Sequence, residues 1–133
     1  MLKLEHLGIA VKELEQSIPL FEQLLNTPCY KTEGVESEGV KTAFFKVGES
    51  KIELLEATNT ASPIAKYIDK KGEGIHHIAF EVENIGAEMK RLAALGFEIL
   101  NEKPKDGADN KLVCFLHPKT TNGVLIELCQ EKK

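Results

Sequence analysis

Two short motifs that each occur twice constrain the fold of this chain more than any other feature. The motif EHLGIAV, starting at residue 5, recurs as HHIAFEV from residue 76, which aligns His6 with His77 at an offset of 71 residues. The motif KIELL, starting at residue 51, recurs as LIELC from residue 125, which aligns Glu53 with Glu127 at an offset of 74 residues. Motifs that recur in the same order and at nearly the same offset indicate a duplicated module.

Both halves of the chain show the same order of expected elements. In the first half, the spacing of apolar residues predicts a strand, a helix and three more strands, over residues 3–11, 14–25, 29–33, 40–47 and 51–57. The second half predicts the same order, over residues 76–82, 85–95, 97–102, 111–117 and 123–129. Each half is therefore a βαβββ module, and the fold class is α+β.

A module of about 65 residues is marginally stable alone, so we expect the two to share one domain over residues 1–133. Its expected parts are module 1 over about 2–57, a linker helix over about 62–73 and module 2 over about 75–130. The two modules are expected to form a curved mixed sheet around a metal-containing cleft.

Local signals mark several ends of these elements. Pro19 would break a hydrogen bond inside the first helix, which favours a helix start near Ser17. Asn84 is a candidate N-cap and Gly96 a candidate stop for the helix over 85–95. Ser62-Pro63 predicts the start of the linker helix, and Asn122-Gly123 predicts a hairpin turn.

Composition excludes several classes of protein. The net charge of −4 argues against a nucleic-acid-binding protein, and no apolar run reaches the roughly 20 residues that a membrane-spanning helix needs. The three cysteines form no CxxC pair, which argues against a disulfide framework or a structural zinc cluster. A reducing compartment, the cytoplasm, fits this pattern best.

The four repeated residues form a candidate metal site. His6 lies on the same strand face as Gly8, opposite the apolar face that would pack on a helix, and His77 has the same position in the repeat. Glu53 and Glu127 alternate with apolar neighbours in the same way. A single histidine or glutamate of this kind is ordinarily structural, but the repetition of the pair in phase favours metal binding.

The four side chains are two imidazoles and two carboxylates, which suit a divalent transition ion such as Co²⁺, Mn²⁺, Ni²⁺ or Zn²⁺. Four protein ligands on a six-coordinate ion leave two positions for water or substrate oxygens, as a catalytic metal needs.

Stretches throughout the chain resemble the methylmalonyl-CoA epimerase family of the vicinal oxygen chelate superfamily. They are HLGIAV from residue 6, KIELLE from 51, SPIA from 62, GIHHIA from 74, FLHPK from 115 and GVLIEL from 123. The resemblance implies that His6, Glu53, His77 and Glu127 are metal ligands, and the family varies between Gln and Glu at the position of Glu53. It also implies a small-molecule acyl-CoA substrate, a homodimer, and a divalent cofactor, with Co²⁺ the first ion to test.

The implied reaction interconverts (R)- and (S)-methylmalonyl-CoA by removing the proton at C2 and returning it on the other face. Glu127 is the first candidate for the general base and Glu53 a candidate for the second transfer. One position departs from the family, because some of its members have a catalytic glutamate where this chain has Thr42, and a threonine is no useful base.

Two alternatives remain open at this stage. A lyase similar to glyoxalase I would use the same ligands on a glutathione hemithioacetal, whereas a non-catalytic binding module of the same fold would need no metal ligands. An extradiol dioxygenase would need Fe²⁺ and a two-histidine, one-carboxylate site, against which Glu53 counts. Lys103, Lys105 and Lys111 are expected on the solvated surface, where an anionic substrate tail could use one of them.

Overall fold

The computed structural model describes residues 1–132, which form two compact units. The N-terminal unit comprises His6–His76, and the C-terminal unit comprises Met1–Glu5 together with the chain from His77 onward. Strand β1 (Lys3–Ala10) therefore contributes its first residues to the C-terminal unit and the rest to the N-terminal unit. The repeat in the sequence corresponds to the two units.

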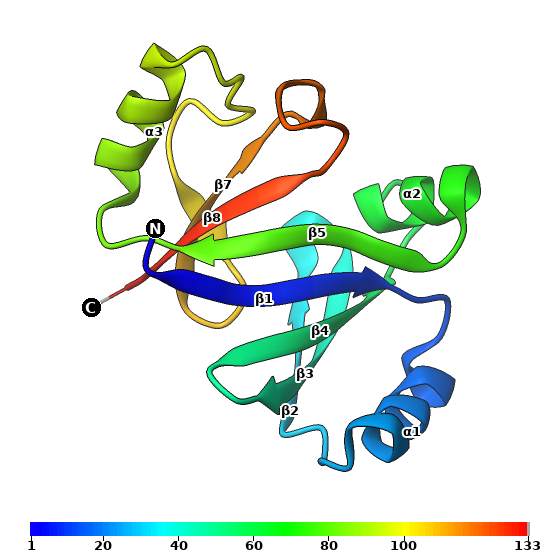
Figure 1. The fold of residues 1–133 in the computed structure, drawn as a ribbon. Coiled ribbons are helices and arrows are strands. Elements are labelled where there is room, and N and C mark those ends of the chain that lie inside the picture. The colour runs from blue at the N-terminus through cyan, green and yellow to red at the C-terminus, as the bar shows by residue number, and fades with distance from the viewer. Residues whose placement is uncertain (133) are drawn as a thin grey trace. The chain divides into compact units, whose positions relative to one another are not determined.

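The N-terminal unit has one βαβββ module followed by a helix (Figure 1). After β1 its elements are α1 (Leu14–Leu25), β2 (Lys31–Val35), the 3₁₀ turn η1 (Glu36–Glu38), β3 (Val40–Val47), β4 (Ser50–Ala57) and α2 (Pro63–Lys71). The strand order is β2-β3-β4-β1, in which β1 pairs with β4 in parallel and the other pairs are antiparallel.

The C-terminal unit repeats this topology. Its elements are β5 (Gly74–Glu81), which enters this unit at His77, α3 (Ile85–Ala94), β6 (Lys105–Gly107), β7 (Lys111–Leu116), the 3₁₀ turn η2 (Pro118–Thr120) and β8 (Ile126–Glu131). The strand order is β5-β8-β7-β6, in which β5 pairs with β8 in parallel. The prediction of two βαβββ modules is confirmed.

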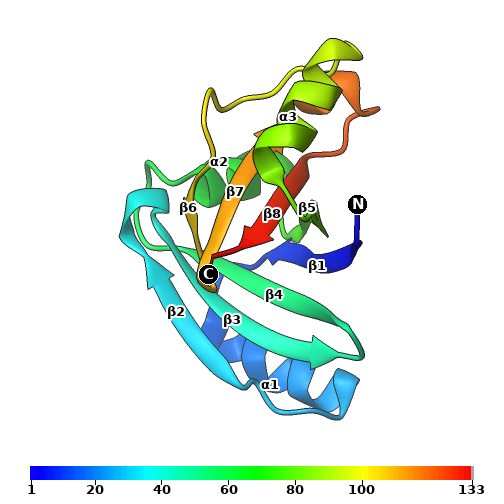
Figure 2. The same ribbon diagram turned by 90° about the vertical axis from the view of Figure 1, so that its left-hand side faces the viewer.

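Each unit has its own apolar core between one sheet face and one helix. Helix α1 covers one face of β3 and β4, where Leu14, Phe45 and Leu54 are buried (Figure 2). Helix α3 packs in the same way on β7 and β8 through Met89 and Leu92. Since strand side chains alternate, the other face of each sheet is left for the repeated His and Glu residues.

Two predicted N-caps are confirmed. The Ser62 hydroxyl accepts a hydrogen bond from the Ile64 amide at 3.1 Å, and the Asn84 side chain accepts one from the Ala87 amide at 3.0 Å. Gly96, at φ +98°, follows the end of α3 as predicted.

The predicted start of the first helix near Ser17 is wrong, because α1 begins at Leu14 and contains Pro19. The Leu14 amide donates to a Glu56 carboxylate oxygen at 2.6 Å, so β4 supplies the cap that fixes this earlier start. Pro19 is exposed, where water can satisfy the helix carbonyl that lacks its usual donor.

Several strand boundaries also differ from the prediction. β2 begins at Lys31 rather than 29, because the Cys29 amide is held by the Glu22 carboxylate at 2.9 Å. Residues 97–102 form only an isolated bridge at Ile99, and β6 lies later, at Lys105–Gly107.

The predicted hairpin turn at Asn122-Gly123 is only half right. Both residues have positive φ, at +55° and +85°, as such a turn requires. They nevertheless belong to a longer connection that includes η2, and β8 begins at Ile126 rather than 123.

None of the helices described is long and apolar enough to cross a membrane.

Candidate metal centre

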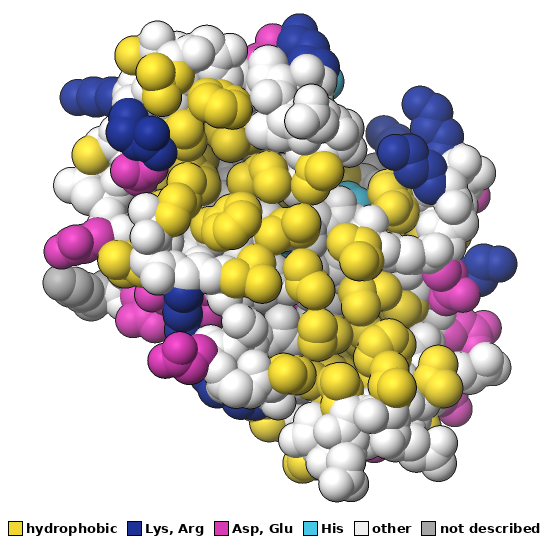
Figure 3. Space-filling view, in the orientation of Figure 1, with side chains coloured by type: hydrophobic (Ala, Val, Ile, Leu, Met, Phe, Trp, Pro, Cys, Tyr) yellow, Lys and Arg dark blue, Asp and Glu magenta, His cyan; other side chains and the backbone are white. Residues whose placement is uncertain are grey.

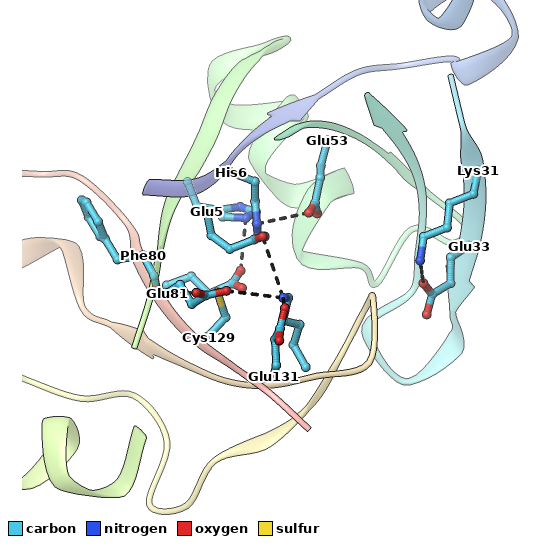
Figure 4. A network of polar contacts seen from close by, with 12 residues as sticks. Glu5, His6, Lys31, Glu33, Glu53, Phe80, Glu81, Cys129 and Glu131 are labelled. Carbon is cyan, nitrogen blue, oxygen red and sulfur yellow. Dashed lines mark hydrogen bonds and ion pairs between the residues drawn. The ribbon is translucent and has the colours of Figure 1, made fainter. Parts of the chain in front are cut away.

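The first His–Glu pair lies within the N-terminal unit. His6 Nδ1 lies 3.1 Å from Glu53 Oε2, and both side chains are buried (Figure 4). The parallel register places Gly8 opposite Glu53, so His6 lies two residues before that pairing, on the same face of the sheet. The structure thus brings these two predicted ligands together.

The second pair has the same position within the C-terminal unit, but the other ring nitrogen of its histidine faces the glutamate. His77 Nε2 lies 3.2 Å from Glu127 Oε1, and both side chains are again buried. Ala79 is the register partner of Glu127, which matches Gly8 opposite Glu53. The small residue opposite each glutamate leaves space above the sheet for the paired side chains.

An aromatic residue flanks each glutamate, and the sequence analysis missed it. Phe44 is the antiparallel partner of Glu53, and Phe115 is that of Glu127. The Phe115 ring meets the His77 ring edge-on, with the centroids 6.0 Å apart. The two phenylalanines are separated by 71 residues, the offset of the two histidines, so the repeat itself could have revealed them.

Thr42 lies on the same face as Glu53 and is almost completely buried. It pairs with Leu55 on one side and with Glu33 on the other. Thr42, the position at which some family members have a glutamate, therefore lies on the sheet face that carries His6 and Glu53. On the adjoining strand β2, its register partner is the carboxylate residue Glu33.

Lys111 is buried, so its expected place on the solvated surface is wrong. Its Nζ lies 3.8 Å from Glu5 Oε2, 3.8 Å from Glu81 Oε1 and 3.4 Å from Glu131 Oε1, all within the C-terminal unit. The three carboxylates converge in Figure 4. A buried ammonium is tolerated only when carboxylates compensate its charge, as they do here.

The two cysteines of the C-terminal sheet are buried and free. Burial and the nearby Glu127 carboxylate raise the pKa of Cys114 from its ordinary 9.0 to about 11. The pKa of Cys129 is raised further, first by burial and then by the charges of Glu127 and Glu5. Both side chains are therefore neutral thiols at physiological pH, which makes them poor metal ligands beside the carboxylates.

The remaining histidines are held by local contacts. His76 packs edge-on against Tyr67, with the ring centroids 5.0 Å apart. His117 Nδ1 accepts a hydrogen bond from the Lys119 amide at 3.0 Å and so caps η2. Lys119 pairs with Glu98 at 2.9 Å and holds the pKa of that carboxyl below its usual range.

The donor atoms of the two pairs suit a divalent ion. In each pair an imidazole nitrogen faces a carboxylate oxygen at hydrogen-bond distance in a buried setting, and all four residues are among those able to hold a metal. Nitrogen and carboxylate oxygen together favour ions such as Zn²⁺, Co²⁺, Ni²⁺ and Mn²⁺.

Comparison with known proteins defines the class. The profile of the Glyoxalase/Bleomycin resistance protein/Dioxygenase superfamily matches residues 5–115, and the chain belongs to this family. The family predicted from the paired modules is thereby confirmed.

Relatives within this family are more specific. The chain is 40% identical to the ethylmalonyl-CoA/methylmalonyl-CoA epimerase of Cereibacter sphaeroides, over 96% of this chain and 97% of that protein. It is 39% identical to the mitochondrial methylmalonyl-CoA epimerase of Homo sapiens, over 96% of this chain and 73% of that protein. A variant of the Streptomyces coelicolor methylmalonyl-CoA epimerase, solved with 2-nitronate-propionyl-CoA, superposes with a TM-score of 0.96 at 32% identity, covering 100% of this chain and 99% of the other.

Proposed function

We infer that this chain is an epimerase that interconverts (R)- and (S)-methylmalonyl-CoA. This inference rests on two observations together: the sequence similarity to epimerases extends over nearly the whole of this chain, and both buried His–Glu pairs are present. A homologous epimerase, similar at a TM-score of 0.94, has been solved with methylmalonyl-CoA itself. These relatives favour the epimerase over the lyase and the binding module that the sequence left open.

We propose that His6, Glu53, His77 and Glu127 together hold one divalent ion. The support is the identical register of the two pairs, the burial of all four side chains and the family to which the chain belongs. Co²⁺ is the first ion to test, followed by Zn²⁺, Mn²⁺ and Ni²⁺. Such an ion would stabilise the negative charge that develops on the substrate oxygens when C2 loses its proton.

Glu127 is the proposed general base. Its carboxylate is buried and lies next to His77 and Phe115, which keeps water away and allows it to accept the C2 proton. The electron pair of the C–H bond is then delocalised into the thioester carbonyl as an enolate. The reaction is complete when a proton returns to C2 from the opposite face.

Glu53 is the ligand that could donate that second proton. A group outside the ligand set is the alternative for this second transfer.

The test is a stereochemical assay. Purified protein, stripped of metal and then supplied with Co²⁺, is incubated with (S)-methylmalonyl-CoA, and the (R)-epimer is quantified. We expect Co²⁺-dependent formation of the (R)-epimer, and no turnover of the glutathione hemithioacetal of methylglyoxal. Turnover of the hemithioacetal alone would instead assign the lyase reaction.

We further propose that the protein is a homodimer in the cytoplasm and that its substrate is a soluble acyl-CoA. In the C-terminal unit, Leu2 and Leu4 expose 58% and 39% of their surface, and hydrophobic side chains gather over β5 in Figure 3. Apolar surface of this kind is typical of contacts between subunits. Light scattering coupled to size-exclusion chromatography would give the mass in solution, and a monomeric mass would contradict the dimer.

A further inference from the structure

We propose that Lys105 binds the free carboxylate of the substrate and so distinguishes methylmalonyl-CoA from acyl-CoA molecules that lack this group. This inference rests on the proposed epimerase function and adds to it a residue that determines specificity. The residues that support it all belong to the C-terminal unit: Lys105, Phe115, His77 and Glu127.

Lys105 lies on the sheet face that carries Glu127. Its register partner on β7 is Val113, which in turn pairs with Cys129 of β8. Cys129 follows Glu127 by two residues, so alternation along β8 puts both on one face. Val113 and Cys129 pack with Ala79, the register partner of Glu127, in a small apolar cluster. Lys105 therefore shares the face of the proposed base and not the face that packs on α3.

Two contacts place the Lys105 ammonium near the proposed base. Lys105 Nζ lies 5.6 Å from the centre of the Phe115 ring, and Phe115 is the register partner of Glu127. The His77 ring meets the same phenylalanine edge-on, with the centroids 6.0 Å apart. The ammonium group and the His77–Glu127 pair thus border a single aromatic ring.

The close approach of β6 to β7 holds Lys105 at this position. Figure 2 shows β6 beside β7, and the two strands pair from Lys105 to Gly107. A Cβ atom at Gly107 would lie 2.8 Å from Cγ1 of the buried Val113. An atom cannot come that near without displacing Val113, so the glycine permits the packing that fixes β6.

Lys105 is the lysine of these strands that a bound molecule can reach. The other lysine among the described residues of β6, β7 and β8 is Lys111, which is buried and held by three carboxylates. Lys105 is half-buried instead, so its ammonium can contact a substrate bound over this face.

The free carboxylate is the anionic group of the substrate nearest to the reacting carbon. It is bonded directly to C2, whereas the phosphates of coenzyme A are separated from C2 by the whole pantetheine arm. A cation that borders the ring beside the proposed base therefore suits the carboxylate and not the phosphates. An ammonium binds a carboxylate through a charge-assisted hydrogen bond, which is roughly twice as strong as a neutral one.

Two ligands that differ only in the carboxylate test this assignment. Methylmalonyl-CoA, as the mixture of its epimers, and propionyl-CoA are titrated into metal-loaded protein in a calorimeter. For Lys105→Met we expect the dissociation constant of methylmalonyl-CoA to rise at least tenfold, because the carboxylate loses its counter-charge. The dissociation constant of propionyl-CoA should change less than threefold, and the metal content should equal that of the wild type.

Two further variants separate a direct contact from a general effect of charge. Lys105→Arg keeps a cation at the same position and should bind methylmalonyl-CoA within threefold of the wild type. Lys103→Met removes an exposed positive charge two residues away and should change neither dissociation constant by more than twofold.

Three results would overturn the assignment. They are unchanged binding of methylmalonyl-CoA by Lys105→Met, equal weakening of both ligands, which would place the lysine on the coenzyme A moiety, and a loss of the same size in Lys103→Met. Failure of the proposed function is a separate result: wild-type protein would bind methylmalonyl-CoA without converting one epimer into the other.

Discussion

At the residue scale, the two glutamates proposed as metal ligands occupy equivalent positions but should differ in chemistry. Glu53 faces His6 at 3.1 Å and Glu127 faces His77 at 3.2 Å, each opposite a small residue and beside a phenylalanine. We propose that Glu127 is the residue that abstracts the C2 proton. Substitution by glutamine distinguishes these roles, since an amide oxygen can still bind a metal but cannot accept a proton at neutral pH.

We predict that Glu127→Gln lowers the rate of epimerisation by at least 100-fold, whereas Glu53→Gln lowers it less than tenfold. Both variants should retain metal, as measured by mass spectrometry of the protein-bound ion. A loss of similar size in both variants would assign the second proton transfer to Glu53.

Burial of Cys114 predicts a pH dependence of stability. Its pKa is about 11 in the folded protein and near 9.0 when unfolded, so the folded state keeps a proton that the unfolded state loses. The contribution of Cys114 to the free energy of unfolding is fully present below pH 9 and is lost as the pH rises toward 11. Between pH 8 and pH 10, urea unfolding should show the wild type losing about 1 kcal/mol more than Cys114→Ala. Equal losses in the two proteins would contradict the raised pKa.

At this scale the sequence predicted the four repeated residues but not their neighbours. The His and Glu residues repeat within short motifs, so the alternation along each strand and the two similar offsets of 71 and 74 residues were enough to find them. The 71-residue offset also relates Phe44 to Phe115, but their contact with the two glutamates becomes visible only when the strands are placed in register, and strand pairing is not encoded in any short motif.

At the scale of elements, helix caps and one buried ion cluster are the contacts most open to test. Asn84 caps α3, which carries the apolar face of the C-terminal unit. We expect Asn84→Ala to lower the free energy of unfolding by about 1 kcal/mol, because the Ala87 amide loses its acceptor. Asn84→Ser should recover most of this loss in chemical denaturation, and a Ser variant no better than the Ala variant would contradict the capping role.

Lys111 connects the first residues of β1 with β5 and β8 inside the C-terminal unit. Lys111→Met should cost about 3 kcal/mol of stability, because it leaves the buried Glu5 carboxylate without its counter-charge. Lys119→Met is the matched control, since it removes an exposed pair with Glu98 and should cost less than about 1 kcal/mol. Similar losses of stability in the two variants would show that the buried ion pairs of Lys111 stabilise the fold no more than the exposed pair of Lys119.

Prediction from the sequence was most accurate for helices and strands with strong periodicity and weakest where tertiary contacts set the ends. α3 and α2 carry their own caps, so their bounds were nearly correct. The start of α1 depends on Glu56 of β4, which is remote in the sequence, and β6 forms where Lys105–Gly107 meets β7 rather than where apolar residues are densest.

At the scale of the whole molecule, we propose that residues of both units bind one ion. Metal-stripped protein should therefore bind one divalent ion per chain, and the midpoint of thermal unfolding should rise with the concentration of Co²⁺. His6→Ala and His77→Ala should each weaken binding, although they lie in different units. Two ions per chain, or binding that is weakened by only one of these variants, would indicate separate sites.

The most direct test of the central claim is deuterium incorporation at C2 of methylmalonyl-CoA in D₂O, followed by mass spectrometry. We predict fast incorporation by the Co²⁺-loaded protein, a rate near the protein-free control after removal of the metal, and no recovery when Co²⁺ is added to His6→Ala. Absence of incorporation by fully metal-loaded wild-type protein would contradict the claim that this chain abstracts a proton from the substrate.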